Sequence, residues 1–130
     1  MDQLSHPALH RVVARAERDS EVLAVILFGS RARGDAGPGS DIDVCLVLAS
    51  DAASSEAAAR KRSEYLSEPD VDLTVFQQLG LHVRSRVLKE GTVLFVRDED
   101  ALYALAARTA RAFEHFRHFQ RRYLDEVARG

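Results

Sequence analysis

The sequence VLAVILFGSRARG, residues 22–34, is followed after six further residues by the acidic segment DID, residues 41–43. Residues 22–28 are a continuous run of β-favouring apolar side chains, which predicts a strand covered on both faces. Gly29 comes directly after this strand, and glycine allows a backbone to approach a ligand closely. Ser30 adds a hydroxyl beside the backbone N–H groups of a turn, a combination that suits phosphate oxygens. The sequence therefore predicts a phosphate-binding turn at the end of the strand.

Acidic residues follow on two further predicted strands, residues 42–48 and 71–76. Asp41 and Asp43 are two residues apart, so both carboxylates are expected on one face. Such a like-charged pair has no use in an apolar core, whereas Mg²⁺ binds one or two carboxylates together with substrate phosphates. If the strand that Asp72 opens lies beside the strand of Asp43, a third carboxylate joins them. Three acids can hold two metal ions.

Two alternatives remain for this acidic cluster. Asp70 competes with Asp72 as the third carboxylate because the two share a face, although Pro69 favours a turn at that point. The whole pattern could also be a polar loop with chance acids on a strand. A Gly-Ser pair alone or an Asp-x-Asp pair alone would not exclude that explanation. Their joint occurrence after a strand, with a third acid on another strand, favours a metal and phosphate site.

The periodicity of the whole chain predicts the order α-β-β-α-β-α-β-α. This is an α+β (α/β-type) sandwich, with a mixed sheet of about four strands and helices packed against it. Helices are expected over residues 7–18, 53–67, 79–90 and 99–128, and strands over 22–28, 42–48, 71–76 and 92–97. Ser5 is expected to cap the first helix, Ser50 or Asp51 the second, and a left-handed Gly91 to close the third. We expect one domain, residues 1–130, with its core at about 20–97.

Bulk properties narrow the class of protein. The formal charge of −2 argues against general nucleic-acid coating, so no direct nucleic-acid binding is expected. Cys45 is the only cysteine, which excludes an intrachain disulfide, and its apolar neighbours predict a packed core position. The N-terminus has neither the basic start nor the apolar run of a signal peptide. The longest apolar run, residues 22–28, is far too short to span a bilayer. A cytoplasmic protein without a membrane association is expected.

The C-terminal helix has an apolar stripe flanked by arginines. The stripe consists of Leu102, Leu105, Thr109, Phe113, Phe116, Tyr123 and Val127. The simpler explanation is a helix packed on its own sheet, with a solvated basic face. However, about 30 helical residues are roughly 45 Å long, more than a domain of this size covers. The far end is therefore expected to contact a protein partner, around Phe116, Phe119, Arg121, Arg122 and Tyr123.

The motifs GSRARG, SDID and VDL together resemble the polymerase-β-type nucleotidyltransferase superfamily, over roughly residues 22–97. The short length without a second domain resembles its minimal nucleotidyltransferase branch, whose members often act as antitoxins to HEPN-domain toxins. The resemblance implies that Gly29 and Ser30 hold the triphosphate of a nucleotide and that Arg33 braces the turn.

The same resemblance implies the metal chemistry. Asp41 and Asp43 would bind both of two Mg²⁺ ions, with Mn²⁺ able to substitute. Asp72 would complete the catalytic metal site and help to deprotonate the acceptor hydroxyl. ATP is the expected substrate, although no residue in the sequence indicates which base is selected.

The implied function is Mg²⁺-dependent transfer of AMP from ATP to a hydroxyl, expected to be a tyrosine, of a partner HEPN toxin. The chain would then be the antitoxin of a toxin–antitoxin pair. The nucleotide-binding core takes up nearly the whole length, so the acceptor must supply its own docking surface, as a protein does. One alternative is a transferase for a small cationic acceptor such as an aminoglycoside, because the first hundred residues carry a net charge of about −5. The other is an antitoxin that neutralises its partner by binding alone.

Overall fold

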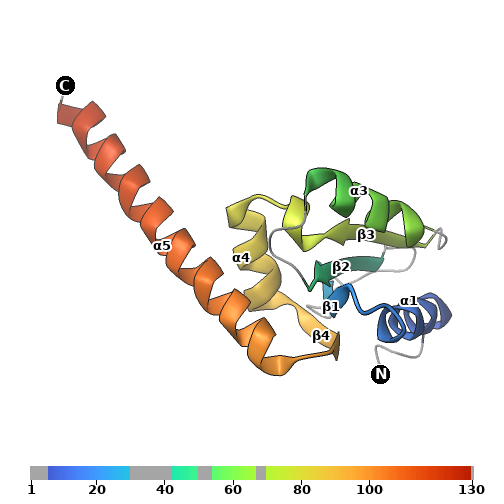
Figure 1. The fold of residues 1–130 in the computed structure, drawn as a ribbon. Helices are drawn as coiled ribbons and strands as arrows, with labels where there is room; N and C mark the ends of the chain where they lie inside the picture. Colours follow the sequence, from blue (N-terminus) through green and yellow to red (C-terminus); the bar gives the residue numbers. More distant parts are fainter. Residues whose placement is uncertain (1–5, 30–41, 50–53, 67–69, 130) are drawn as a thin grey trace.

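The computed structural model describes residues 6–29, 42–49, 54–66 and 70–129. Its elements follow the chain in the predicted order, with one added 3₁₀ turn (Figure 1). They are α1 (Pro7–Glu17), β1 (Val22–Phe28), β2 (Ile42–Leu48), α3 (Ser55–Glu64), β3 (Val71–Val75), η2 (Phe76–Gln78), α4 (Leu81–Glu90), β4 (Thr92–Val96) and α5 (Glu99–Arg129).

The four strands form one mixed sheet in the order β3-β2-β1-β4. The central strand β1 is antiparallel to both β2 and β4, whereas β2 and β3 are parallel. A parallel pair requires a crossover, and α3 provides it. This topology brings the end of β1 and the starts of β2 and β3 to the same end of the sheet. The predicted α+β sandwich with a mixed sheet is confirmed.

Helices cover both faces of the sheet (Figure 1). α1 and α3 lie on one face, over a core that includes Leu9, Val25 and Leu73. α4 and the first half of α5 lie on the other face, where Ile26 and Leu105 are buried. Because β1 is central and covered on both sides, its apolar residues are almost completely buried, as the unbroken apolar run predicts.

The strands match the prediction closely, and the deviations have local causes. β1 and β2 have the predicted bounds. β3 ends one residue earlier than predicted because Phe76 begins the 3₁₀ turn η2, where its ring is fully buried. β4 also ends one residue early, at Val96, although the backbone N–H of Arg97 still donates to Leu23 O at 2.7 Å. Cys45 is fully buried within β2, as predicted.

Both predicted N-caps are wrong. α1 is capped by His6, whose Nδ1 accepts a hydrogen bond from the backbone N–H of Ala8, and the expected Ser5 lies outside the described residues. α3 starts at Ser55 rather than near residue 53, and Ser54 Oγ accepts from Ala57 N at 3.0 Å. In each case the capping side chain directly precedes the first helical residue, where it can reach the unpaired N–H groups of the first turn.

Gly91 closes α4 as expected, but the expected left-handed conformation is wrong. Gly91 has a φ of −77°, which any residue can adopt, so it does not close α4 in a left-handed conformation. A Cβ at this position would instead collide with the side chain of Ile26 and the carbonyl oxygen of Val87. Glycine is therefore required here because the end of α4 passes very close to β1.

The last helix, α5, extends far beyond the sheet (Figure 1). Leu105 and Thr109 are buried against the domain and Phe113 is half-buried. Every described side chain from Glu114 to Arg129 is exposed. The projecting part of α5 is thus about 24 Å long at 1.5 Å per residue. Across the described ranges, no helix has both the length and the apolar character that a membrane span requires.

Candidate active site

The turn after β1 and the start of β2 meet closely at one end of the sheet. Gly29 has a φ of +77°, the one positive φ found among the described glycines. A Cβ on Gly29 would collide with Oδ2 of Asp43. Only glycine satisfies both demands, since side-chain-bearing residues rarely adopt this φ and none fits against the carboxylate. The backbone at Gly29 therefore lies close to the carboxylate of Asp43, and its approach to a phosphate stays a prediction.

Asp43 and Asp72 are directly opposite each other on neighbouring parallel strands. Side chains alternate along a strand, so both carboxylates lie on the face covered by α4, the face of Cys45 and Thr74. Asp43 is half-buried and Asp72 is exposed. The condition for the third carboxylate, that the third strand lies beside the second, is met.

Asp70 lies in a turn and directly precedes β3. Its carbonyl oxygen accepts a hydrogen bond from the N–H of Ile42 at 3.2 Å. Asp72, rather than Asp70, is the residue in register with Asp43. The other predicted site residues, Ser30, Arg33 and Asp41, lie outside the described residues.

A small pocket adjoins this end of the sheet. It has a volume of about 130 Å³ and is lined by Phe28, Gly29, Val83, Arg86, Val87 and Glu90. α4 thus provides one wall and the end of β1 the other. Arg86 and Glu90 form an ion pair at 3.6 Å across one helical turn. Nothing in the sequence distinguishes this pair, because its spacing is that of any solvent-exposed helical ion pair.

The chain matches the family described as "Polymerase beta, Nucleotidyltransferase" over residues 11–100. This match covers all four strands and the two described carboxylates. The chain belongs to the polymerase beta nucleotidyltransferase family.

The relatives of this nucleotidyltransferase agree with its fold. A protein of Methanocaldococcus jannaschii named "Putative protein adenylyltransferase" is 29% identical over 76 residues, which are 58% of this chain. The chain matches 57% of the length of that relative. A toxin–antitoxin complex with AMP-PNP contains a chain with a TM-score of 0.67 and 22% identity, over 90% of this chain and 96% of that one.

A second solved structure extends over almost the whole chain. It is the tri-AMPylated HEPN toxin of Shewanella oneidensis in complex with an MNT antitoxin, and its matching chain has a TM-score of 0.65 and 20% identity. The match covers 98% of both chains. The fold of the nucleotidyltransferase, including its long last helix, is therefore shared with these structures.

A larger hollow of about 480 Å³ lies elsewhere in the nucleotidyltransferase, between α4, β4 and α5. Its walls are mainly apolar, and Glu99 is the acidic residue among them. Neither Asp43 nor Asp72 lines it. A polar phosphoryl-transfer site needs charged groups that converge on one point, so the smaller pocket beside Gly29, not this hollow, adjoins the candidate active site.

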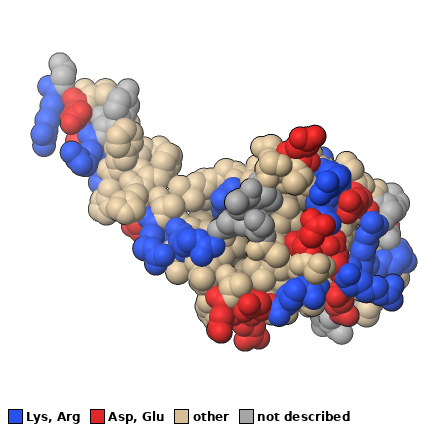
Figure 2. Space-filling view, in the orientation of Figure 1, with Lys and Arg blue, Asp and Glu red and all other residues tan. Residues whose placement is uncertain are grey.

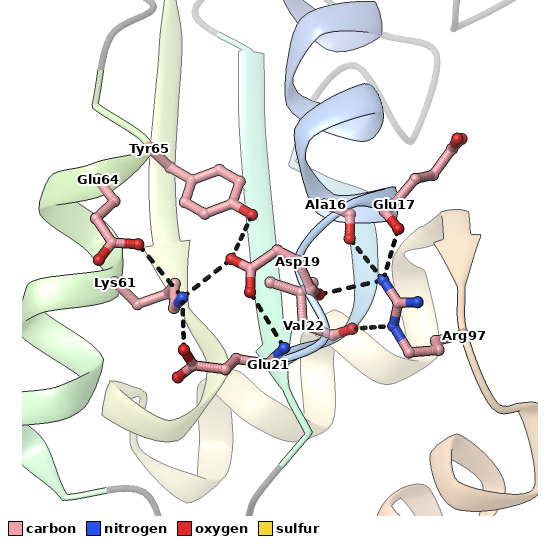
Figure 3. A network of polar contacts seen from close by, with 9 residues as sticks. All are labelled: Ala16, Glu17, Asp19, Glu21, Val22, Lys61, Glu64, Tyr65 and Arg97. Atoms are coloured by element: carbon pink, nitrogen blue, oxygen red, sulfur yellow. Dashed lines mark hydrogen bonds and ion pairs between the residues drawn. The ribbon is translucent and has the colours of Figure 1, made fainter.

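A second polar cluster lies at the opposite end of the sheet from Gly29 (Figure 3). Lys61 on α3 is only 4% exposed, and its Nζ contacts Asp19 at 2.9 Å, Glu64 at 3.3 Å and Glu21 at 3.4 Å. The hydroxyl of Tyr65 donates to the same oxygen of Asp19 at 2.9 Å. This cluster joins α3 to the turn before β1.

Its pKa values agree with a structural ion pair. Burial by itself would raise the pKa of Asp19, but the hydrogen bonds from Lys61 and Tyr65 outweigh it, so the pKa is lowered. Burial would lower the pKa of Lys61, but the hydrogen bonds to Asp19 and Glu64 raise it. Both groups stay charged near neutral pH, which suits a fixed pair rather than a proton-transfer group.

Arg97 adds further hydrogen bonds at this end of the sheet, between the residue after β4 and the end of α1 (Figure 3). Its guanidinium donates to the carbonyl oxygens of Ala16 at 2.7 Å and Glu17 at 3.1 Å, at the end of α1. It also donates to the carbonyl oxygens of Asp19 and Val22. The unpaired carbonyls at a helix C-terminus need such donors. Local sequence patterns do not reveal the roles of Arg97 and Lys61, because their partners are distant in the sequence.

Cys45 can be set aside as a catalytic nucleophile. Burial raises the pKa of its thiol to about 12. The reactive form of cysteine is the thiolate, which is then scarce at neutral pH. The carboxylate pair beside Gly29 remains the candidate active site.

Proposed function

We propose that this nucleotidyltransferase transfers AMP from ATP to a hydroxyl, expected to be a tyrosine, of a partner HEPN toxin, and so acts as its antitoxin. The observation that carries the proposal is the register of Asp43 with Asp72, directly beside the left-handed turn at Gly29. This arrangement combines a place for phosphate oxygens with two acidic groups on one face. Nothing in the packing of a core requires such a like-charged pair.

The residues fit a divalent metal. Asp43 and Asp72 offer hard carboxylate oxygens on adjacent strands, the donor type that Mg²⁺ prefers. Asp41, Asp43 and Asp72 would hold two Mg²⁺ ions, with Mn²⁺ able to substitute. The bound metal would supply charge neutralisation on the phosphates and lower the pKa of the acceptor hydroxyl.

The chain's own residues would then position the substrates. The backbone at Gly29 would approach the triphosphate, and Ser30 would donate its hydroxyl to a phosphate oxygen. Arg33 would brace the turn. Asp72 is exposed on the edge strand β3, where it would meet the acceptor hydroxyl and help to take its proton.

The projecting half of α5 supports a protein as the acceptor. Phe116, Phe119, Leu124 and Val127 are all large apolar side chains with 48–71% exposure. They continue the face through which Leu105 packs on the domain. A helix segment of this length is marginal in water without tertiary contacts, so a partner that covers the apolar side would stabilise it.

Basic residues accompany the apolar ones on this segment (Figure 2). Arg121 and Arg122 are exposed on either side of the apolar face, and Tyr123 is the further predicted contact residue. Arginine and aromatic residues are enriched where proteins meet. We therefore place the docking surface for the partner around Phe116, Phe119, Arg121, Arg122 and Tyr123.

The named relatives agree with this proposal. One is named as a protein adenylyltransferase, and the two solved complexes are toxin–antitoxin pairs, one with AMP-PNP and one with an AMPylated HEPN toxin. We propose a cytoplasmic location, since the sequence has a single cysteine and disulfides are rare in the cytosol.

The test is incubation of the purified protein with ATP, Mg²⁺ and the helical protein encoded next to it, followed by intact mass measurement of both chains. The expected result is a gain of one or more AMP units on the partner, mapped to a tyrosine by peptide sequencing. A neutralised partner of unchanged mass would show an antitoxin that acts by binding alone. Transfer of AMP to an aminoglycoside, with the partner unmodified, would show a small-molecule transferase.

A further inference from the structure

The wall of α4 that faces the end of β1 carries one basic side chain. Of the residues that line the pocket beside Gly29, Arg86 is the cation and Glu90 is the anion, and the others are apolar or glycine. α4 lies over the same sheet face as Asp43 and Asp72. A positive group is therefore held within one small pocket with the turn that approaches Asp43.

The neighbouring cations of α4 have other roles. The guanidinium of Arg84 donates to the carbonyl oxygens of Leu79 at 2.8 Å and Gln77 at 3.0 Å, so it holds the preceding turn in place. Lys89 lies 5.6 Å from the ring of Phe113 on α5, on the side of α4 that faces that helix. Arg86 differs from both, since it borders the pocket and forms an ion pair with Glu90, a carboxylate on the same helix.

The ion pair between Arg86 and Glu90 is weak enough for Arg86 to leave Glu90 and bind another anion. The two atoms are 3.6 Å apart, and the side chains are 58% and 44% exposed. Exposed pairs of this kind are weak because water screens them and because both long side chains lose freedom. A triphosphate carries several negative charges, and guanidinium binds phosphate oxygens in a planar, two-pronged manner that a single carboxylate at this distance does not use.

We propose that Arg86 is a phosphate-binding residue of this site, which leaves Glu90 and contacts a phosphate group of the nucleotide when the nucleotide occupies the turn at Gly29. This inference rests on the proposed nucleotide site and adds to it a residue outside the family motif. Glu90 acts as the competitor: it keeps Arg86 beside the pocket in the empty state and opposes phosphate binding by its own charge.

The test is equilibrium binding of ATP and of inorganic tripolyphosphate, each with Mg²⁺, to the whole protein by calorimetry. Arg86→Gln is expected to raise the Kd for both ligands by about ten- to a hundredfold, the loss of a charge-assisted hydrogen bond. Glu90→Gln is expected to lower both Kd values about two- to fivefold. Lys89→Gln removes the same charge from the same helix away from the pocket, and both Kd values should stay within about twofold.

Arg86→Lys provides a second variant, which keeps the charge and should recover part of the affinity for both ligands. Thermal melting verifies folding. Because Arg86, Lys89 and Glu90 are all exposed, the melting temperatures of all four variants should be unchanged.

Three results would overturn the proposal while wild-type binding is intact. The first is an equal effect of Arg86→Gln and Lys89→Gln. The second is weaker ATP binding with unchanged tripolyphosphate binding, which would place Arg86 at the base or ribose. The third is a loss of affinity in Glu90→Gln as large as in Arg86→Gln, which would make the ion pair a structural unit. If the wild-type protein bound neither ligand, the proposed function itself would be wrong as well.

Discussion

The carboxylate of Asp43 lies against Gly29, at the position where the Cβ of any other residue would be. The two residues come from neighbouring antiparallel strands, since Phe28 pairs with Asp43 at the end of β1. Gly29 adopts its left-handed φ of +77° directly beside this carboxylate. The turn and the acidic group are thus one unit, and a change in either displaces the other.

Replacement of Gly29 by alanine should therefore disrupt both stability and transfer. The positive φ costs a residue with a side chain about 1–2 kcal/mol, and the new methyl group would push Asp43 aside. Because a small displacement of a reacting group lowers rates strongly, we expect transfer to fall by about a hundredfold or more. Urea unfolding and single-turnover AMP transfer are the measurements.

Gly80→Ala is the matched control for that variant. Gly80 has a φ of −69° and precedes α4, and a Cβ there would meet nothing within 4 Å. Its stability should change by less than about 1 kcal/mol, with transfer unaffected. Equal activity of the two alanine variants would mean that the contact with Asp43 is irrelevant to the reaction.

Asp72→Asn should abolish most transfer without harm to the fold. Asp43 and Asp72 are like charges in register, so removal of one charge should leave the metal-free melting temperature unchanged or higher. The transfer rate should fall about a thousandfold, as for loss of a group that moves a proton. Asp70→Asn, two residues earlier, should keep the rate within a few-fold. A comparable loss of transfer rate in Asp70→Asn would mean that Asp72 is wrongly assigned as the third carboxylate.

Lys61→Met should destabilise the protein by about 3 kcal/mol, because removal of one partner leaves the charge of Asp19 in a mostly buried place without its cation. Arg60→Met, an exposed position on the same helix, should change the free energy of unfolding by less than about 0.5 kcal/mol. Below their melting temperatures both variants should retain transfer, since Lys61 lies at the opposite end of the sheet from Gly29. Urea titrations report the free energies, and a stability of Lys61→Met equal to that of Arg60→Met would contradict the assigned role.

The same cluster predicts how stability depends on pH. The pKa of Asp19 is lowered in the folded protein from its ordinary value of 3.8, because its hydrogen bonds outweigh its burial. Its contribution is therefore fully present above that ordinary value and is lost as the pH falls through the lower folded pKa. Asp19→Asn lacks the carboxylate and therefore does not lose this stabilisation as the pH falls. The difference in unfolding free energy between wild type and Asp19→Asn should shrink as the pH is lowered from 5 to 2. A constant difference over this range would show that Asp19 does not titrate with a lowered pKa.

Charge reversal on the projecting helix should separate docking from nucleotide binding. Arg121→Glu with Arg122→Glu should slow AMP transfer to the partner toxin by about tenfold or more, since charge pairs at protein interfaces guide association. The Kd for ATP should be unchanged, because these residues belong to the part of α5 that projects beyond the sheet (Figure 1). Arg111→Glu, an exposed residue nearer the domain, is the control and should transfer normally. An unaltered rate in the double variant would move the docking surface elsewhere.

Local patterns were sufficient to predict most of the fold. The apolar runs of β1 and β2 depend on nearest neighbours, and both strands have the predicted bounds. The caps were less predictable because several serines and acids precede α3, and each could satisfy the first turn. Ser54 is the N-cap because the packing of α3 places its first residue at Ser55.

Gly91 shows the limit of such patterns more clearly. Glycine suits a left-handed helix end and also a close approach of two backbones, and the sequence alone does not separate the two reasons. The structure shows the second, since a side chain would collide with Ile26 on β1.

The sequence by itself determined the order of helices and strands, the turn motif at Gly29 and the acidic residues that follow it, because these depend on short-range periodicity and residue chemistry. The tertiary structure alone decided which groups meet. Parallel pairing of β2 with β3 brought Asp72 level with Asp43, and packing of α4 on β1 brought Arg86 to the same pocket as Gly29. Lys61 reaches Asp19 across 42 positions of the chain. Contacts between distant segments arise from the shared burial of their apolar faces, which no local pattern specifies.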